Sequence, residues 1–421
     1  MCEPKICETV AEERYIMKKN LLKPVNLFLT VSLSGTILFI LVMIMGWGLG
    51  AEWIVMENNF DNTFTDHFRH IAFASDMKHF YFNTNDATFP PFAYLLYYLL
   101  YRINPDSWGV YDWKICRDYR YNIIVFIALL LLVIIAYKYI CDKVLAEYSN
   151  EKRTWFVIAT VLSAPVLVGA IERGNISFLT AILVIYALYL KDSSNKVLRE
   201  TALILIAVAA GIKLYPAIAG IIYLREKRWK EAIRLAIYGM LVFFVPFAFC
   251  GGIAGFIQYL RILFFFEGQG YRSWTNIRNY LLSISDLFGL YERSAYFVKY
   301  FKITENLFLL FSIASMFKTD KSWKQILYPA GIMSLYIPFS YRYTAVYMLI
   351  PLFFYLRDTY DGYADHPVSN KVYPVLFGLV FTLPVWGMLT PFSADFHIFT
   401  PIYILMIYSF VEDWAKKSRL K

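Results

Sequence analysis

The sequence predicts an all-α, polytopic integral membrane protein with about twelve transmembrane helices. Of its 421 residues, 59% are hydrophobic and 17% are charged, and the mean hydropathy is +0.48. Soluble domains are about 45–50% apolar and about 25% charged. Aromatic residues make up 19% of the chain, as expected where many helices meet the membrane–water boundary. This composition argues against a water-soluble enzyme, a disordered chain or a disulfide-rich secreted scaffold.

Apolar segments long enough to cross about 30 Å of hydrocarbon recur along the chain. The segment 200–224 is counted as two short helices that meet at Gly211–Pro216, because a lysine at the bilayer centre costs a few kcal/mol. This break is expected to place Lys213 at an external, hydrated vertex. The predicted spans are 26–48, 121–140, 154–171, 176–190, 200–224 (two helices), 232–250, 303–317, 325–340, 343–356, 372–390 and 398–412.

Charge distribution orients these spans with both ends in the cytoplasm. The predicted cytoplasmic segments hold 25 of the 41 lysines and arginines, as the positive-inside rule requires. Residues 1–25 are then a cytoplasmic tail, while 49–120 and 251–302 are two large external loops, the first of them catalytic. The whole chain, 1–421, is predicted to be a single integral membrane domain. The net charge of +9 needs no nucleic acid partner on this topology.

The first external loop contains a short amphipathic segment, 88–103. Its tyrosines at 94, 97, 98 and 101 follow the i, i+3, i+4, i+7 spacing of one helical face. Leucines lie mostly on the other side. This pattern predicts a helix in the membrane interface rather than a span.

The same loop offers the candidate catalytic residue, Asp66, with His67 and His70 beside it. A carboxylate can act as a general base when it lies within hydrogen-bond reach of a hydroxyl. A solvated loop helix and a metal site are the alternative interpretations. No clear set of further ligands completes a metal site, and the five cysteines have no metal-ligand spacing. We therefore predict no metal and no cofactor.

Isolated charges next to apolar segments are the remaining candidates. Glu172 and Arg173 are the only charged residues between Arg153 and Lys191, and Lys213 stands alone in GIKLYP. Such residues are functional candidates by default, and cations here suit a phosphate. A salt-bridged turn or an interfacial anchor is the structural alternative. No nucleotide-binding motif is found, so a transferase would need a lipid-linked donor.

A second group of candidates lies late in the chain, in IPFSYRYTAVYMLIP. Arg342 falls at the external end of a predicted span, between Tyr341 and Tyr343. A guanidinium suits bidentate phosphate recognition. We expect Arg342 and Lys213 to share one phosphate.

The order of these features resembles membrane glycosyltransferases of the GT-C fold, most closely family GT87 (DUF2029). The resemblance covers about residues 26–357, and each of its motifs is short. It rests on Asp66, Phe89-Pro90-Pro91-Phe92, Gly174-Asn175, Lys213–Pro216 with the basic loop Arg225–Trp229, and Pro338–Tyr343.

The resemblance implies an inverting transfer of a mannose-like hexose from a polyprenyl-phosphate donor to a glycan or glycolipid acceptor. Asp66 would be the base, and Lys213, Arg173 or Arg342 would stabilise the leaving phosphate, with Asn175 also in the site. The family favours a bacterial plasma membrane, with membrane lipids as further partners. It often has histidine at the position of Arg342 and tryptophan at that of Tyr341. Arginine stays charged, so Arg342 suits phosphate contact rather than proton transfer.

Two other functions use the same cations. A transporter or flippase for a lipid-linked or anionic substrate would need no base, but many transporters carry two related halves and no second copy of the Asp66 or Lys213 element is found. A ligase that joins lipid-linked glycans is the alternative among enzymes. A purely structural role would leave the cost of charges within apolar segments uncompensated.

Overall fold

The computed structural model describes residues 23–46, 60–103, 113–268, 275–289, 294–336, 341–360, 368–383 and 394–415. Throughout these ranges the regular structure is helical, in agreement with the predicted fold class. Parts of several predictions lie outside the described residues: the tail 1–22, the end of the span 26–48, residues 49–59 and 104–112 of the predicted first external loop, Pro338–Ser340 and the end of the span 372–390.

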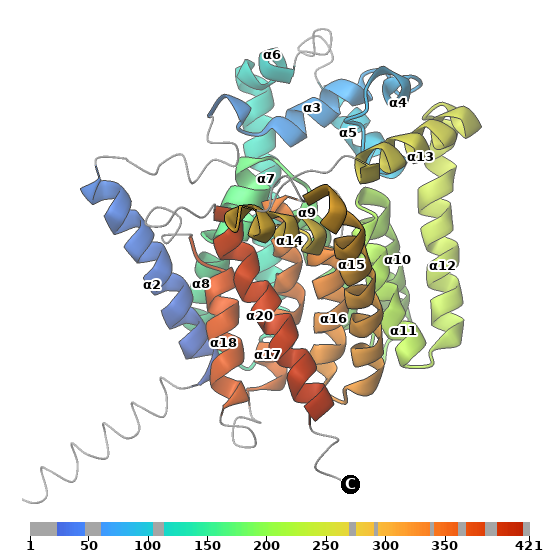
Figure 1. Cartoon of the computed structure of the whole chain (residues 1–421). Helices are drawn as coiled ribbons and strands as arrows, with labels where there is room; N and C mark the ends of the chain where they lie inside the picture. Colours follow the sequence, from blue (N-terminus) through green and yellow to red (C-terminus); the bar gives the residue numbers. More distant parts are fainter. Residues whose placement is uncertain are drawn as a thin grey trace, which may run out of the picture.

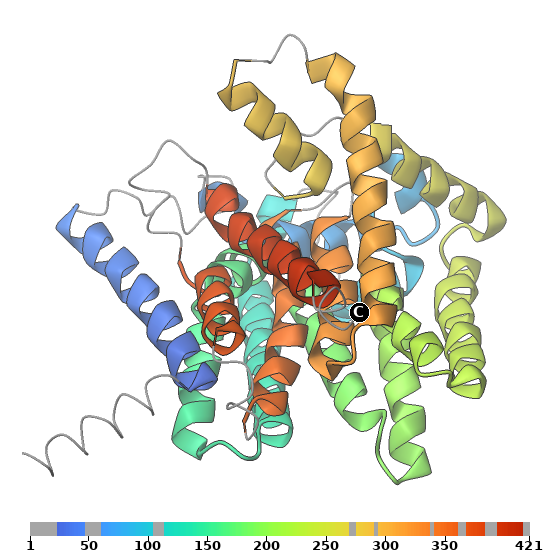
Figure 2. The same cartoon turned by 60° about the horizontal axis from the view of Figure 1, so that its bottom comes forward.

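Within the described ranges, four helical segments are long and apolar enough to cross a membrane. They are α2 (Pro24–Met45), α7 (Arg120–Val144), α12 with its 3-10 extension η6 (Trp229–Ala248), and α20 (Ala394–Ala415, with the apolar part from Asp395). Helices α2 and α12 stand at opposite edges of the bundle (Figures 1 and 2). Both expose large apolar side chains, such as Ile44 and Ile233, as expected for contact with lipid. The chain is a membrane protein, while the total of twelve spans stays a prediction.

The predicted span 154–171 is a bent pair of helices. Helix α8 (Asn150–Val161) and the π-helical segment η4 (Ala164–Glu172) meet at 58° and together form a fifth candidate span. Pro165 explains the bend, since it lacks an N–H and its ring would clash with the carbonyl four residues before it, at the end of α8. Ser163, at the break, is extended (φ −77°, ψ 159°).

The predicted break in 200–224 is confirmed. Helix α10 (Lys196–Ile212) ends before Lys213, whose backbone is extended (φ −140°, ψ 132°). The chain resumes in η5 (Tyr215–Gly220) and α11 (Ile221–Arg225), with 6 and 5 residues. Each is too short to cross the hydrocarbon core alone.

The described part of the predicted first external loop is a packed helical cap rather than an irregular loop. The cap lies at one end of the molecule, opposite the C-terminal end of α20 (Figure 1). It consists of α3 (Thr65–Ala74), α4 (Phe80–Asn83), α5 (Pro91–Ile103) and α6 (Trp113–Asp118), together with α13 (Gly252–Gly268). They share a hydrophobic core of their own, separate from that of the bundle. The tyrosine face of α5 turns into this core, since Tyr94 and Tyr97 are buried while Leu99 is exposed.

The second predicted external loop, 251–302, also contains helices. It includes α13, α14 (Ile277–Leu287) and the start of α15 (Ser294–Lys318), so the helix that contains the predicted span 303–317 begins nine residues before that span. The remaining helices of the bundle are α9 (Ser177–Leu190), α16 (Ser322–Leu335), η8 (Arg342–Met348), α17 (Leu349–Asp358) and α18 (Ser369–Val380).

Cysteine labelling tests the predicted orientation of the cap. His79, in the cap, and Lys230, at the start of α12, are both exposed. In a cysteine-free background, we expect a membrane-impermeant maleimide added outside intact cells to label His79→Cys and not Lys230→Cys. The reverse pattern would place the cap in the cytoplasm.

Candidate functional site

Asp66 is held where the cap meets the bundle. The first turn of α3 lies against the turn between η4 and α9, because Phe64 N–H donates to the Glu172 carbonyl (2.7 Å) and Asp66 N–H donates to the Arg173 carbonyl (3.0 Å). Asp66 lies in the first turn of α3, which begins at Thr65. The backbone thus fixes the position of the carboxylate relative to 172–175.

Both carboxylate oxygens of Asp66 have a partner from this turn. Arg173 Nε donates to Oδ1 (3.0 Å), and Asn175 Nδ2 donates to Oδ2 (2.5 Å). The Asn175 amide is oriented in turn by Ser177, whose N–H (3.0 Å) and hydroxyl (2.6 Å) both donate to Asn175 Oδ1. Arg173 and Asp66 are little exposed. The arrangement is a preorganised, charge-assisted clamp on one carboxylate.

The surroundings keep Asp66 ionised. Burial would raise the pKa of its carboxyl, but the charge of Arg173, with that of Lys213 and the hydrogen bond from Asn175, outweighs burial and lowers the pKa below its usual value. At neutral pH the group is therefore a carboxylate that can accept a proton.

Gly174 permits the close approach of α3. Its φ is +69°, and a Cβ there would lie 2.8 Å from His67 Cβ. Left-handed backbone costs a residue with a side chain about 1–2 kcal/mol, and the clash would also push α3 away from Asn175. The glycine that precedes Asn175 is thus required by geometry.

We expect Gly174→Ala to lower both the melting temperature and the activity. The matched control is Gly239→Ala in α12, where no atom lies within 4 Å of an added Cβ and where alanine should stabilise the helix by up to about 1 kcal/mol. Thermal unfolding of the two variants measures the difference. Equal melting temperatures would contradict the close packing of α3 on the turn.

Lys213 lies in an aromatic cage, and the prediction of a hydrated vertex is wrong. The side chain is 2% exposed, and Nζ lies 4.1 Å from the ring centroid of Phe89, 4.5 Å from that of Tyr343 and 5.7 Å from that of Tyr215. Among the described residues Nζ has no hydrogen-bond partner. Ring faces attract an ammonium group, but they are not ordinary hydrogen-bond acceptors. The N–H donors of Lys213 are therefore available to a ligand.

Arg342 forms an ion pair that the sequence analysis did not predict. Its Nε donates to Asp395 Oδ1 (2.6 Å), and both side chains are mostly buried. Gly169 of η4 lets the backbone of η8 approach, since a Cβ there would lie 2.8 Å from Tyr343 N. Tyr343 reaches the Lys213 cage from the same segment. The structure therefore places the Arg342 segment beside the Lys213 cage, while the sharing of one phosphate stays a prediction.

We expect Asp395→Ala to reduce stability, because it leaves Arg342 buried without its carboxylate. The expected loss is about 2–4 kcal/mol, somewhat below the cost of breaking a fully buried pair. Asp86→Ala is the control, because Asp86 pairs with Arg69 at the solvent-accessible surface. Such exposed pairs contribute about 0–1 kcal/mol to stability. Denaturant unfolding in detergent measures both, and equal losses would contradict the ion pair.

The other predicted site residues are also placed. His67 and His70 are buried in α3, and burial lowers the pKa of each to about 3, so both are neutral at physiological pH. His70 Nδ1 lies 2.9 Å from the Tyr94 hydroxyl. Glu172 is buried and supplies the backbone carbonyl that accepts from Phe64. The Tyr341 ring packs beside that of Tyr343, at 5.9 Å.

The described ranges contain no group of three histidine, cysteine, aspartate or glutamate side chains that could hold a metal ion. Two further aspartates of the predicted first external loop, Asp61 and Asp76, do not belong to the clamp. Asp61 is in the 3-10 turn η2 (Phe60–Asn62), and Asp76 accepts from the exposed His79. Among the first-loop aspartates, Asp66 is the one bound to Arg173 and Asn175.

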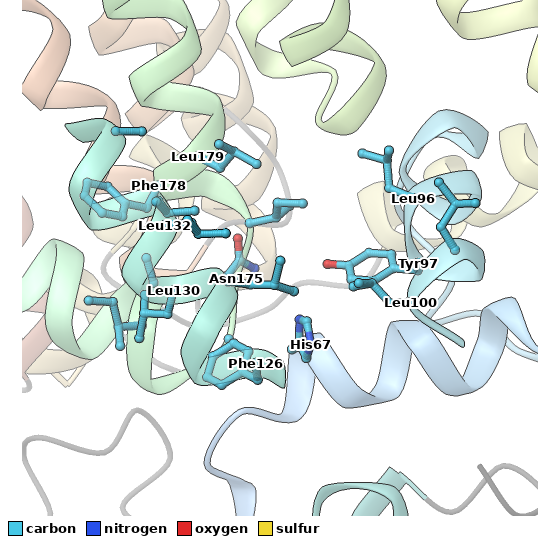
Figure 3. Close-up of a pocket in the computed structure, with 18 residues that line it drawn as sticks. His67, Leu96, Tyr97, Leu100, Phe126, Leu130, Leu132, Asn175, Phe178 and Leu179 are labelled. Atoms are coloured by element: carbon cyan, nitrogen blue, oxygen red, sulfur yellow. The ribbon is translucent and has the colours of Figure 1, made fainter. Parts of the chain in front are cut away.

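A cavity of about 530 Å³ lies beside the clamp, between α5, α7 and α9 (Figure 3). Asn175, His67 and Gly174 line its polar end. Most of the other lining residues are leucines and aromatics, and they include Leu96, Leu100, Leu132, Phe126 and Phe178. The sequence analysis did not predict this cavity, because its walls come from three separate segments.

The comparisons with known proteins give one match. The model of glycosyltransferase family 87 matches residues 87–322. This range includes the Phe89–Phe92, Gly174–Asn175 and Lys213–Pro216 elements, and it leaves Asp66 and Arg342 outside. No curated protein and no solved structure matches the chain.

The match covers more than half of the 421 residues. It agrees with an all-helical membrane protein that brings the Gly174–Asn175 and Lys213 elements to one end of the bundle. The chain belongs to glycosyltransferase family 87.

Proposed function

We propose that this glycosyltransferase moves a mannose-like hexose from a polyprenyl-phosphate carrier to an acceptor hydroxyl, with inversion, on the outer face of the membrane. One observation carries the proposal: an ionised, clamped carboxylate, Asp66, lies near a buried lysine, Lys213, whose N–H donors have no partner in the described structure. Phe89 lies between the two groups, because its ring stacks on that of His70 in α3 at 3.9 Å and lies 4.1 Å from Lys213 Nζ. The charge of Lys213 also helps to lower the pKa of Asp66. A base and a phosphate site are the two groups that such a displacement needs.

The chemistry follows from these two groups. The acceptor oxygen attacks the anomeric carbon as its proton passes to an Asp66 carboxylate oxygen. The bond from that carbon to the phosphate oxygen breaks on the opposite face, and its electron pair leaves with the lipid phosphate. Lys213 stabilises the negative charge that develops there. Arg173 and Asn175 hold Asp66 in position and do not themselves transfer the proton.

Burial of Lys213 also favours an anionic ligand. Moving an ammonium group out of water without giving it a carboxylate partner raises the free energy of the folded protein. A lipid phosphate would supply the missing acceptor, and its hydrogen bonds with the charged group would recover part of that cost. The cage itself is apolar and aromatic, which suits the first isoprene units beside the phosphate.

A transfer assay with purified protein tests the proposal. Synthetic polyprenyl-phosphate mannose and polyprenyl-phosphate glucose would each be incubated with a panel of alkyl hexosides, and products would be identified by mass spectrometry. We expect an elongated glycoside with a lipid-linked donor and none with GDP-mannose. Movement of the intact lipid across a vesicle membrane, without any transfer, would contradict the proposal and favour a flippase.

A further inference from the structure

The cavity between α5, α7 and α9, here called the α5–α7–α9 groove, has walls suited to a hydrocarbon chain. Leu96, Leu99 and Leu100 of α5 face Leu129, Leu130, Leu132, Val133 and Ala136 of α7, and α9 contributes Phe178 and Leu179. Leu99 and Leu132 are more than half exposed. Because α7 is a candidate membrane span, the groove has apolar edges where lipid would surround the helix.

None of the 18 lining residues is a lysine, arginine, aspartate or glutamate. The polar side chains that line it are His67, Tyr97 and Asn175, and the lowered pKa of His67 leaves that ring neutral. A phosphate placed here would lose its water without gaining a cation from the wall. The lining therefore favours a lipid whose head group is neutral, whereas the lysine suited to a phosphate lies in the separate aromatic cage.

The polar end of the groove carries an unused hydrogen-bonding group. Tyr97 is 2% exposed, and its hydroxyl has no partner among the described residues. Figure 3 shows this hydroxyl pointing across the cavity toward Asn175, with His67 beside them. Buried hydroxyl groups usually have partners. A sugar hydroxyl entering the groove could bond Tyr97 and would then lie next to the amide that holds Asp66.

We infer that the α5–α7–α9 groove binds the acceptor, and that this acceptor is a neutral glycolipid whose hydrocarbon chain lies along α7 and whose sugar reaches Asn175. The inference rests on the proposed function and narrows its acceptor from any hydroxyl compound to a lipid-anchored sugar. Acceptor and donor phosphate then approach Asp66 from different parts of the site, one from the groove and one from the Lys213 cage. A displacement with inversion needs this separation, because attack and departure occur on opposite faces of the sugar.

Photo-crosslinking to the full chain in nanodiscs tests the inference without requiring turnover. Three diazirine probes of similar chain length would be compared: a dodecyl hexoside, a polyprenyl phosphate and a phosphatidylcholine. We expect the hexoside to label peptides of α5, α7 and α9, and Val133→Trp, which fills the groove, to reduce this labelling about tenfold or more. Ile135→Trp is the control, because Ile135 is exposed on the same helix and does not line the groove.

Tyr97→Phe tests the polar end separately. The variant keeps the ring and removes a hydroxyl that has no partner within the described ranges, so its melting temperature should not fall. We expect the affinity for the hexoside to drop about tenfold, as for a lost hydrogen bond of ordinary strength. Unchanged affinity would overturn the assignment of Tyr97 to the sugar.

Two labelling patterns would overturn the inference. In one, the polyprenyl phosphate labels the groove more strongly than the hexoside, which would make it the donor site. In the other, phosphatidylcholine labels it as strongly as the hexoside, which would make it a site for ordinary bilayer lipid. Selective hexoside labelling in a protein that transfers no sugar would support the groove and refute the proposed function. Sugar transfer without hexoside labelling of the groove would support the proposed function and refute the groove as the acceptor site.

Discussion

Replacing Asp66 with asparagine is expected to lower sugar transfer by about 10²–10⁴-fold, the usual effect of losing a general base. Asparagine keeps the size of the side chain but cannot accept the proton. Asp61→Asn and Asp76→Asn are the controls, because neither residue belongs to the clamp. Initial rates with a saturating lipid donor measure the effect. Near-normal transfer by Asp66→Asn would show that another group is the base.

The clamp complicates this single variant, and a double variant resolves the difficulty. An asparagine at 66 that accepts from Arg173 would turn its own NH₂ toward Asn175 Nδ2, whose orientation Ser177 fixes. The exchange Asp66→Asn with Asn175→Asp restores a donor–acceptor pair and keeps one carboxylate in the site. We expect it to unfold at a temperature close to wild type and to remain inactive. Recovery of transfer by the exchange would mean that charge in the clamp matters more than the position of the base.

Lys213→Met is expected to weaken donor binding about ten- to a hundredfold, because hydrogen bonds from a charged group contribute about 1.5–3 kcal/mol. Methionine retains an apolar stem among Phe89, Tyr215 and Tyr343 and removes a buried cation that has no carboxylate partner in the described part of the chain. The protein should therefore be at least as stable as wild type. Binding of polyprenyl phosphate to the purified variant, followed by microscale thermophoresis, measures the change. Wild-type affinity would contradict the phosphate site.

Lys324→Met is a matched control for a second buried lysine. Lys324 is buried, like Lys213, but its Nζ lies 2.9 Å from Glu412 and 2.7 Å from Asp413. Its loss removes the ammonium group from the mostly buried Asp413 and one of the two lysines that pair with Glu412, and it should destabilise the protein by about 3–5 kcal/mol. We expect no selective loss of donor affinity. If both lysine variants lose the same stability and the same donor affinity, the free N–H donors of Lys213 do not mark a phosphate site.

The sequence correctly predicted the elements that depend on residues close together in the chain. The tyrosine spacing predicted helix α5, and the lysine in GIKLYP with Pro216 behind it predicted the break after Ile212. The bend between α8 and η4 had a similar signal in Pro165, and it was missed because the apolar run continues across it. Helices as short as η5 and α11 are not recognisable as spans by length, because each is shorter than the hydrocarbon core is thick.

The partners of the charged residues depend on contacts between distant segments. Arg173 meets Asp66 across 107 positions of the chain, and the rings around Lys213 come from three different segments. No spacing rule in the sequence encodes such contacts, so the aromatic cage was unforeseen and Lys213 was placed in water. Asp395 had a usable signal, because it is the only acidic residue between Asp365 and Glu412. An isolated acid before a span suggests a buried cation as its partner.

The anomeric configuration of the product tests the central claim most directly. A polyprenyl-phosphate hexose of known configuration would be converted by the purified enzyme, and NMR coupling constants would give the configuration of the new glycosidic bond. A single displacement with Asp66 as base predicts inversion. Retention of configuration would require a second displacement at the same carbon and would contradict the mechanism built on Asp66 and Lys213.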